Sequence, residues 1–284
     1  MLFRSLGAIA ASDISCAGPL ARSAADLAAM LGVLAGPDGL ESRGYALQLP
    51  KPKLEKLKDF RVAVMVTDAQ SEVDQPLQDL IITCAAFLET KVKSMSWTAR
   101  PAFSTREAFE IYIALLRSAT SRRQSVAEFA ANAETVKGFD PADGSYVANM
   151  LRAYVMPHRS WLFANERRHQ MIKLWDAFFD DWDVLICPTA ASAAFPHDHA
   201  GERHERMIEV NGKQVPTVDQ LFWAGYSCGF NLPSTVAPIG LTSQGLPGGL
   251  QIVARHYDDL TAIRFAELLE REYYSFVPPP MALS

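Results

Sequence analysis

Ser227 is the central residue of the sequence GYSCG (residues 225–229), which matches the G-x-S-x-G pattern of a nucleophile elbow. An elbow places its serine on a sharp turn between a strand and a helix. Here the residues before Ser227 carry a helical pattern and those after it read as extended. His256 is the only histidine downstream, and it precedes Asp258 instead of following an acid. This context favours a turn between two elements, with a nucleophilic serine as the alternative.

A second group with chemical potential is formed by His197, Asp198, His199 and His204. Two histidines two residues apart could share one face of an extended segment, and imidazole is a common zinc ligand. The group falls in a predicted loop, where polar side chains are usually solvated. We therefore expect no metal at these histidines, with zinc binding as the alternative.

The cysteines indicate neither a disulfide framework nor a zinc knuckle, because they are widely spaced and form no C-x-x-C pair. They are Cys16, Cys84, Cys187 and Cys228. Cys187 could in principle be a nucleophile, but it ends an apolar strand and no histidine lies near it in sequence. We expect all four to pack as small hydrophobic residues.

Composition excludes several classes of protein. Hydrophobic residues make up 49% of the 284 residues and charged residues 21%, which is typical of a folded domain. A net charge of -5 gives no general attraction to nucleic acid or anionic lipid. No apolar run reaches the roughly 18 residues of a membrane span, and the N-terminus lacks the pattern of a signal peptide. We expect a cytoplasmic protein that binds neither nucleic acid nor membranes.

Strand and helix patterns alternate along the chain, which predicts an α/β fold. The best-marked helix follows Ser23, a predicted N-cap with Asp26 at the third helical position, and stops before Gly36-Pro37. Residues 104–182 read as mostly helical. The other predicted elements are a strand at 60–66, a helix at 73–88, a strand at 183–187, a strand at 234–237, a turn at 239–248, a strand at 250–254 and a helix at 258–273.

Four segments together resemble the C-terminal portion of the amidase signature family. They read GPLARSAAD (residues 18–26), DVLICPT (183–189), LPSTVAPIG (232–240) and GLPGGLQ (245–251). Their order and spacing extend the resemblance from about Ser5 to Val277. The resemblance implies the C-terminal part of the amidase signature fold, with a mixed β-sheet flanked by helices, in a single partial domain over residues 1–284.

The activity implied for the family is hydrolysis of carbon–nitrogen amide bonds through an acyl-serine, without a metal or organic cofactor. In that family a glycine- and serine-rich segment with two catalytic serines and a lysine lies upstream of the Gly-Pro-x-Ala-Arg segment. Only seventeen residues precede Gly18 here, and no lysine stands in the family's context. We assign no catalytic residue and expect a truncated chain that does not hydrolyse amides alone. A non-catalytic subunit that complements a separate N-terminal half, and a degenerate fragment, are the alternatives.

The resemblance also implies the wall of a substrate cleft, to which we assign Thr189, Asn231 and Gln251 as candidate binding residues. Asn231 replaces a glycine that is usual in the family, and asparagine tolerates the left-handed backbone conformation better than most residues. Arg22 projects from the start of the first predicted helix and is available to a carboxylate or carbonyl. A small-molecule amide would bind only if an N-terminal half completes the site.

The missing half should leave an unpaired strand edge and an apolar patch on the isolated chain. The most apolar candidates for that edge are the predicted strands at 60–66 and 250–254. We therefore expect a homo-oligomer, a complex with an N-terminal amidase fragment, or poor solubility.

Overall fold

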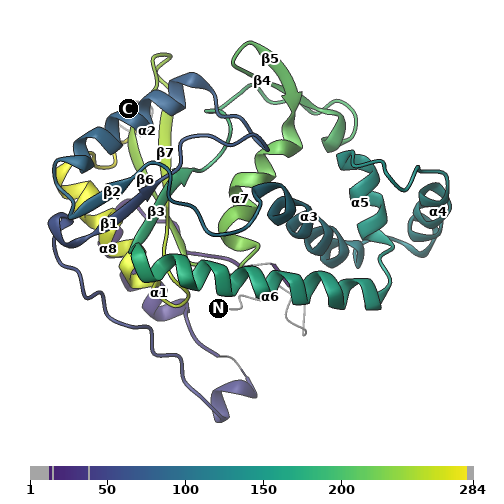
Figure 1. The fold of residues 1–284 in the computed structure, drawn as a ribbon, viewed down its shortest axis with the longest axis horizontal. Helices are drawn as coiled ribbons and strands as arrows, with labels where there is room; N and C mark the ends of the chain where they lie inside the picture. Colours follow the sequence, from purple (N-terminus) through teal and green to yellow (C-terminus); the bar gives the residue numbers. More distant parts are fainter. Residues whose placement is uncertain (1–12, 15, 38, 280–284) are drawn as a thin grey trace.

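A mixed five-stranded sheet, with strand order β2-β1-β3-β7-β6, forms the centre of the protein (Figure 1). The computed structural model describes residues 13–14, 16–37 and 39–279. β1 runs parallel to β2 and β3, whereas β7 is antiparallel to both β3 and β6. The strands are β1 (Arg61–Val64), β2 (Ser94–Ser96), β3 (Val184–Pro188), β6 (Ser234–Leu241) and β7 (Pro247–Val253), with a separate hairpin of β4 (Met207–Val210) and β5 (Lys213–Pro216).

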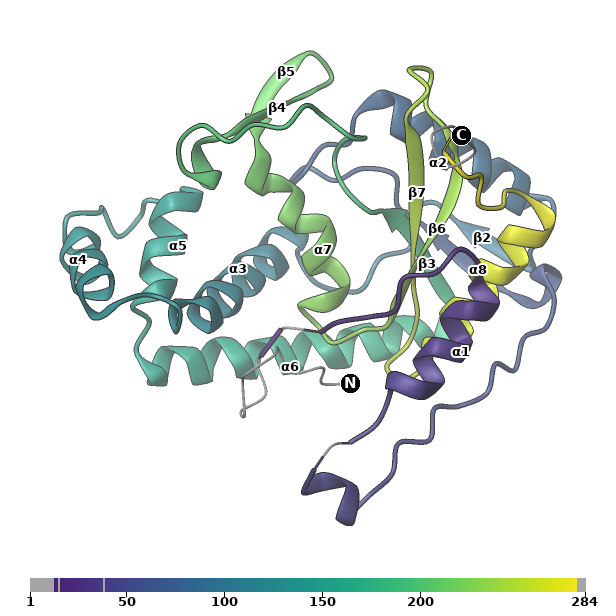
Figure 2. The same ribbon diagram turned by 180° about the vertical axis from the view of Figure 1, so that it is seen from behind.

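Helices cover both faces of the sheet, as the predicted α/β fold requires (Figures 1 and 2). One face packs against α1, α2 and α8, and the other against α6 and α7. The helices are α1 (Ala24–Leu34), α2 (Gln75–Glu89), α3 (Thr105–Ser121), α4 (Val126–Lys137), α5 (Tyr146–Tyr154), α6 (His158–Asp181), α7 (Leu221–Cys228) and α8 (Asp259–Glu272). Within the described part of the chain, no helix combines the length and apolar character needed to cross a bilayer.

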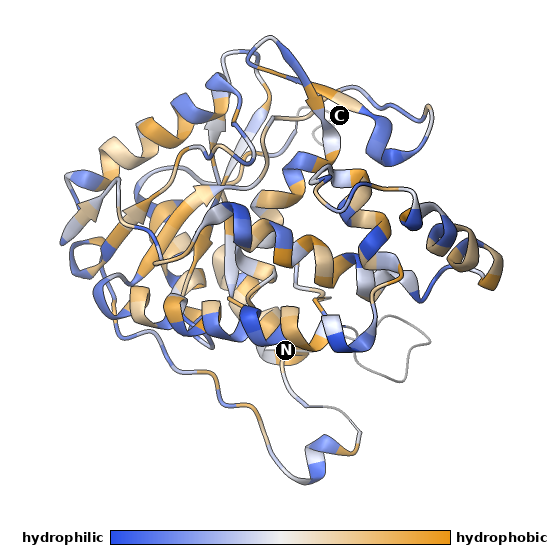
Figure 3. Cartoon of the chain, turned by 45° about the vertical axis from the view of Figure 1, so that its right-hand side comes forward, coloured by the Kyte–Doolittle hydropathy of each residue, from blue (hydrophilic) through white to orange (hydrophobic). Residues whose placement is uncertain are grey.

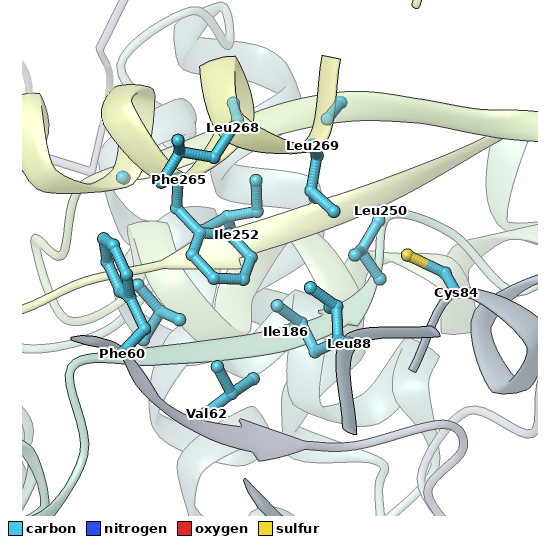
Figure 4. Close-up of a cluster of buried hydrophobic side chains, with 14 of the residues drawn as sticks. Phe60, Val62, Cys84, Leu88, Ile186, Leu250, Ile252, Phe265, Leu268 and Leu269 are labelled. Atoms are coloured by element: carbon cyan, nitrogen blue, oxygen red, sulfur yellow. The ribbon is translucent and has the colours of Figure 1, made fainter. Parts of the chain in front are cut away.

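The period of two along each strand divides the core into two clusters. In β1, Val62 and Val64 belong to the α2 and α8 side, whereas Ala63 belongs to the α6 and α7 side. Figure 4 shows the cluster on the α2 and α8 side. In it the rings of Phe265 and Phe60 lie edge to face, with 5.0 Å between their centres. Because both faces of β1 and β3 are covered, these strands are largely buried and apolar, and Figure 3 shows orange strands at the centre of the sheet.

Local signals placed α1 and β1 correctly. The Ser23 hydroxyl accepts a hydrogen bond from the Asp26 backbone N–H at 3.1 Å, and α1 ends before Gly36, as predicted. The predicted turn at 239–248 is too long, because β6 and β7 stay paired as far as Leu241 and Pro247. The reversal is confined to residues 242–246, where Gly245 has a φ of 77°.

Neither of the two candidates for the unpaired strand edge lies at an edge of the sheet. The segment at 60–66 contains β1 and the segment at 250–254 overlaps β7, and both strands have a neighbour on each side. The edges of the five-stranded sheet are instead β2 and β6. Apolar content marked the internal strands because a central strand is buried on both faces.

Ser227 lies inside α7 and not on a turn or elbow. The glycines around it serve helix packing: Gly225 and Gly229 are four residues apart and face Tyr112 of α3. A Cβ atom on Gly225 would overlap the Tyr112 ring, whereas one on Gly229 would come within 2.6 Å of the Gly225 carbonyl oxygen. The match to G-x-S-x-G therefore arises from a close contact between two helices.

We predict that Gly225→Ala destabilises the protein by about 1–3 kcal/mol or more, because the added methyl group forces α7 and α3 apart. Gly32→Ala is the matched control, since Gly32 lies within α1 and a Cβ there meets nothing within 4 Å. That control should be stabilised by about 0.5–1 kcal/mol. Urea unfolding of the two variants measures the difference, and equal stabilities would contradict the packing role of Gly225.

Candidate functional site

The structure does not bring the three predicted cleft residues together at one end of the sheet. Thr189 follows Pro188, which lies level with Ala237 of β6, whereas Asn231 precedes the opposite end of β6, where Ser234 pairs with Val253. Thr189 directly follows β3 and is half-buried, whereas Asn231 is exposed in the turn between α7 and β6. Asn231 has a φ of 57°, the left-handed conformation expected for an asparagine in place of glycine. Gln251 lies within β7, opposite Cys187 of β3 and Val236 of β6.

Gln251 is 5% exposed, and the protein satisfies both ends of its amide. Its Oε1 accepts a hydrogen bond from the Ser227 hydroxyl at 2.8 Å. Its Nε2 donates to the carbonyl oxygens of Pro188 at 3.3 Å and Trp223 at 3.2 Å. One side chain therefore ties β7 to α7 and to the end of β3, immediately before Thr189.

Ser227 lacks the arrangement of a catalytic serine. It is 2% exposed, and its hydroxyl donates to the Gln251 amide oxygen and lies 3.3 Å from the Ser234 hydroxyl. An amide oxygen cannot take up a proton near neutral pH, so within the described structure the serine has no base in hydrogen-bond reach. The nucleophile elbow is therefore absent, because Ser227 lies within α7 and not on a turn between a strand and a helix.

The Cys187 thiol is also unsuited to nucleophilic chemistry. Burial raises the pKa of this thiol to about 12. The hydrogen bond from the Gln251 amide and the charge of Arg100 lower the pKa, but by less than burial raises it. The thiolate is the reactive form of cysteine, so Cys187 stays protonated and inert at neutral pH. It packs as a small apolar residue, as the sequence predicted.

The loop histidines lie in the exposed segment after β3, with the rings of His197 and His199 5.8 Å apart. Among residues 13–14, 16–37 and 39–279, no three His, Cys, Asp or Glu side chains gather in a way that could hold a metal ion. The absence of a metal at these histidines therefore remains a prediction from the sequence.

The side chains of Thr189, Val236 and Gln251 share one face of the sheet, because they occupy paired or alternate positions on adjacent strands. Gln251 is covered by α7, but Val236 is 55% exposed and Thr189 is half-buried. Gly249 lies between Val236 and Thr189 on this face. A Cβ atom added to Gly249 would be 3.2 Å from Val236 Cγ1 and 3.8 Å from Thr189 Cγ2. This open stretch beside α7 is the candidate site.

The candidate site can contact a ligand but has no reactive group among its described residues. It offers the Thr189 hydroxyl, an apolar surface at Val236 and the exposed hydroxyl-bearing Ser234. None of these is a base at neutral pH. Sequence reasoning missed Val236 and Ser234, although their alternation with buried Thr235 and Ala237 is the pattern of a strand with one open face.

We predict that Gln251→Glu makes stability depend on pH. Burial raises the pKa of the new carboxyl above about 4.3, its value in an unfolded chain. Below that pH the new carboxyl is neutral, so it accepts a hydrogen bond from the Ser227 hydroxyl and donates one hydrogen bond itself. The free energy of unfolding of the variant then approaches that of the wild type. Stability is then lost as the pH rises through the raised pKa, by about 2.7 kcal/mol for a shift of two units.

Urea unfolding at pH 4.5 and pH 8 measures this effect. Gln251→Leu is the control, since it removes the hydrogen bonds at every pH and should be destabilised equally at both values. Identical pH profiles for wild type and Gln251→Glu would contradict the assigned role of the amide.

Comparison with known proteins agrees with this fold. The Amidase family matches residues 4–262. A subunit of the glutamyl-tRNA(Gln) amidotransferase of Nitrosomonas eutropha is 27% identical over 292 residues, covering 95% of this chain and 58% of its own. An acylamidase of Rhodococcus erythropolis is 36% identical over 107 residues, covering 38% of this chain and 22% of its own.

Solved structures show the same architecture. A bacterial aryl acylamidase of the amidase signature family superposes with a TM-score of 0.64 at 20% identity, covering 89% of this chain and 52% of its own. The chain thus spans little more than half the length of relatives that it matches along most of its own length. Since the family match covers most of the chain and includes all four segments, the chain belongs to the amidase signature family.

Proposed function

We propose that this chain is the substrate-supporting half of an amide hydrolase, whose nucleophile lies on a complementing N-terminal half. The observation that carries the proposal is the Ser227 hydroxyl, which donates to an amide oxygen and meets no base in the described part of the chain. Membership of the amidase family supports amide hydrolysis as the reaction of the completed enzyme. The 284 residues contain no glycine- and serine-rich segment with two serines and a lysine.

In the completed enzyme, the complementing half supplies the serine nucleophile, its base and the donors that stabilise the oxyanion. Attack on the amide carbonyl releases the amine, and water then releases the acid from the acyl-serine. This chain contributes Thr189 and Asn231 to the cleft wall, and Gln251 holds the wall from behind. It functions as one partial domain in the cytoplasm, needs no cofactor, and has a small amide as its substrate.

We predict that the purified chain neither hydrolyses aryl amides nor reacts with a fluorophosphonate probe. Removing a nucleophile together with its base leaves only a small residual rate. Intact-mass spectrometry after incubation with the probe measures the result, with Ser227→Ala as the control. Stoichiometric labelling that disappears in Ser227→Ala would show that the chain carries its own nucleophile.

A further inference from the structure

The connections between the parallel strands create a topological switch point at the carboxyl end of β1. The chain passes from β1 through α2 to β2, and then through the helices from α3 to α6 to reach β3, which lies on the other side of β1. α2 packs on one face of the sheet and α6 on the other. Ligands of open α/β sheets bind outside the carboxyl ends of the strands at such a point. Thr189 of the candidate site lies there, one residue beyond β3.

Arg100 is held at the same end of the sheet by two backbone acceptors. Its Nη1 donates to the carbonyl oxygen of Val64, the last residue of β1, at 2.9 Å and to that of Ala99 at 2.7 Å. Its Nε and Nη2 have no partner among the described residues, and neither nitrogen is closed off from solvent. These two nitrogens form one edge of the guanidinium, whose parallel N–H groups match the two oxygens of a carboxylate. The bonds of Nη1 therefore fix the guanidinium and leave a bidentate edge free.

Arg100 lies on the side of the sheet that carries the candidate site. Ala99 and Phe103, on either side of it in sequence, pack against the cluster beneath α6 and α7. Cys187 belongs to the same cluster, and Thr189, two residues further along, faces the same way. Two buried hydroxyls in the segments that follow β1 and β3, those of Ser71 and Ser192, have no partner among the described residues. This end of the sheet therefore retains polar groups that a ligand can use.

The carboxylate of Asp68 decides which anion the free edge of Arg100 suits. Burial raises the pKa of the Tyr226 hydroxyl, the charge of Arg100 lowers it and the charge of Asp68 raises it, so both charged groups lie near this hydroxyl. Asp68 accepts hydrogen bonds from the Gln70 N–H at 2.8 Å and the Thr105 hydroxyl at 3.2 Å, and within the described part of the chain it forms no ion pair with Arg100. Its negative charge repels a dianion more strongly than a monoanion. Arg100 therefore suits a single carboxylate better than a phosphate.

We propose that the free edge of Arg100 binds a carboxylate of the substrate beside Thr189, so that the substrate class is an amide that also carries a carboxylate, such as an N-acyl amino acid. This inference rests on the proposed function, because it names the substrate class of that site. A purely structural role accounts for the two bonds of Nη1 but not for the free Nε and Nη2. Removing the carboxylate from the ligand or the guanidinium from the protein should therefore weaken binding to a similar extent.

The test is an NMR titration of the whole chain with hippurate, the anion of N-benzoylglycine, and with N-benzoylglycinamide as a neutral ligand of nearly the same shape. We expect hippurate to shift the signals of the Arg100 Nε–H and the Thr189 amide, and to bind roughly tenfold more tightly than the neutral ligand or better. Arg100→Gln should lose this advantage, whereas Arg100→Lys, which keeps the charge as a single ammonium group, should recover part of it. Arg106→Gln is the matched control, because the Arg106 side chain is 71% exposed on α3, and should bind as the wild type does. Circular dichroism confirms that each variant is folded.

Three results would overturn the carboxylate site. They are equal affinities for hippurate and N-benzoylglycinamide, an unchanged hippurate affinity in Arg100→Gln, and inorganic phosphate that shifts the same signals at lower concentration than hippurate does. If Arg100→Gln does not fold, the two ligands compared on the wild type, read at the Arg100 Nε–H, still decide. The titration measures no hydrolysis, so its failure counts against the carboxylate alone. Hippurate binding by a completed enzyme that hydrolyses no amide would contradict the proposed function and leave the carboxylate site in place.

Discussion

Backbone N–H and C=O groups along a strand need partners in neighbouring strands or in water, and within the described residues β6, like β2, has a neighbouring strand on one side only. β6 is also the strand whose open face carries the candidate site, next to Thr189 at the end of β3. The side chain of Gln251 joins this region to α7 through buried hydrogen bonds. The position of the cleft wall therefore depends on the same strands that leave an edge unpaired.

The buried polar groups in this region bond to one another. Ser227, Gln251 and the carbonyls of Pro188 and Trp223 satisfy one another inside the core, where an unpaired polar group is costly. The thiol of Cys187 is held neutral by burial. Such an arrangement gives a rigid wall against which a reactive group from elsewhere can be placed.

Local signals in the sequence were sufficient for α1 and β1, since a cap, a stop and an apolar run are properties of neighbouring residues. Long-range packing was not readable in the same way. The glycines around Ser227 resembled an elbow because the pattern does not reveal that Tyr112, more than a hundred residues earlier, presses on them. The sequence did not assign the open edge, and its two most apolar candidates are internal strands. The open edge of β6 was marked instead by Pro238 and by alternating exposed residues, a signal that sequence reasoning did not use.

Amide hydrogen exchange along β6, followed residue by residue by NMR, tests the open edge most directly. The account predicts that the N–H groups of Thr235 and Ala237, which bond to β7, exchange many times more slowly than those of Ser234 and Val236, which point outward. Equal protection of all four amides in the isolated chain would contradict it, because it would mean that the outer edge of β6 is already paired.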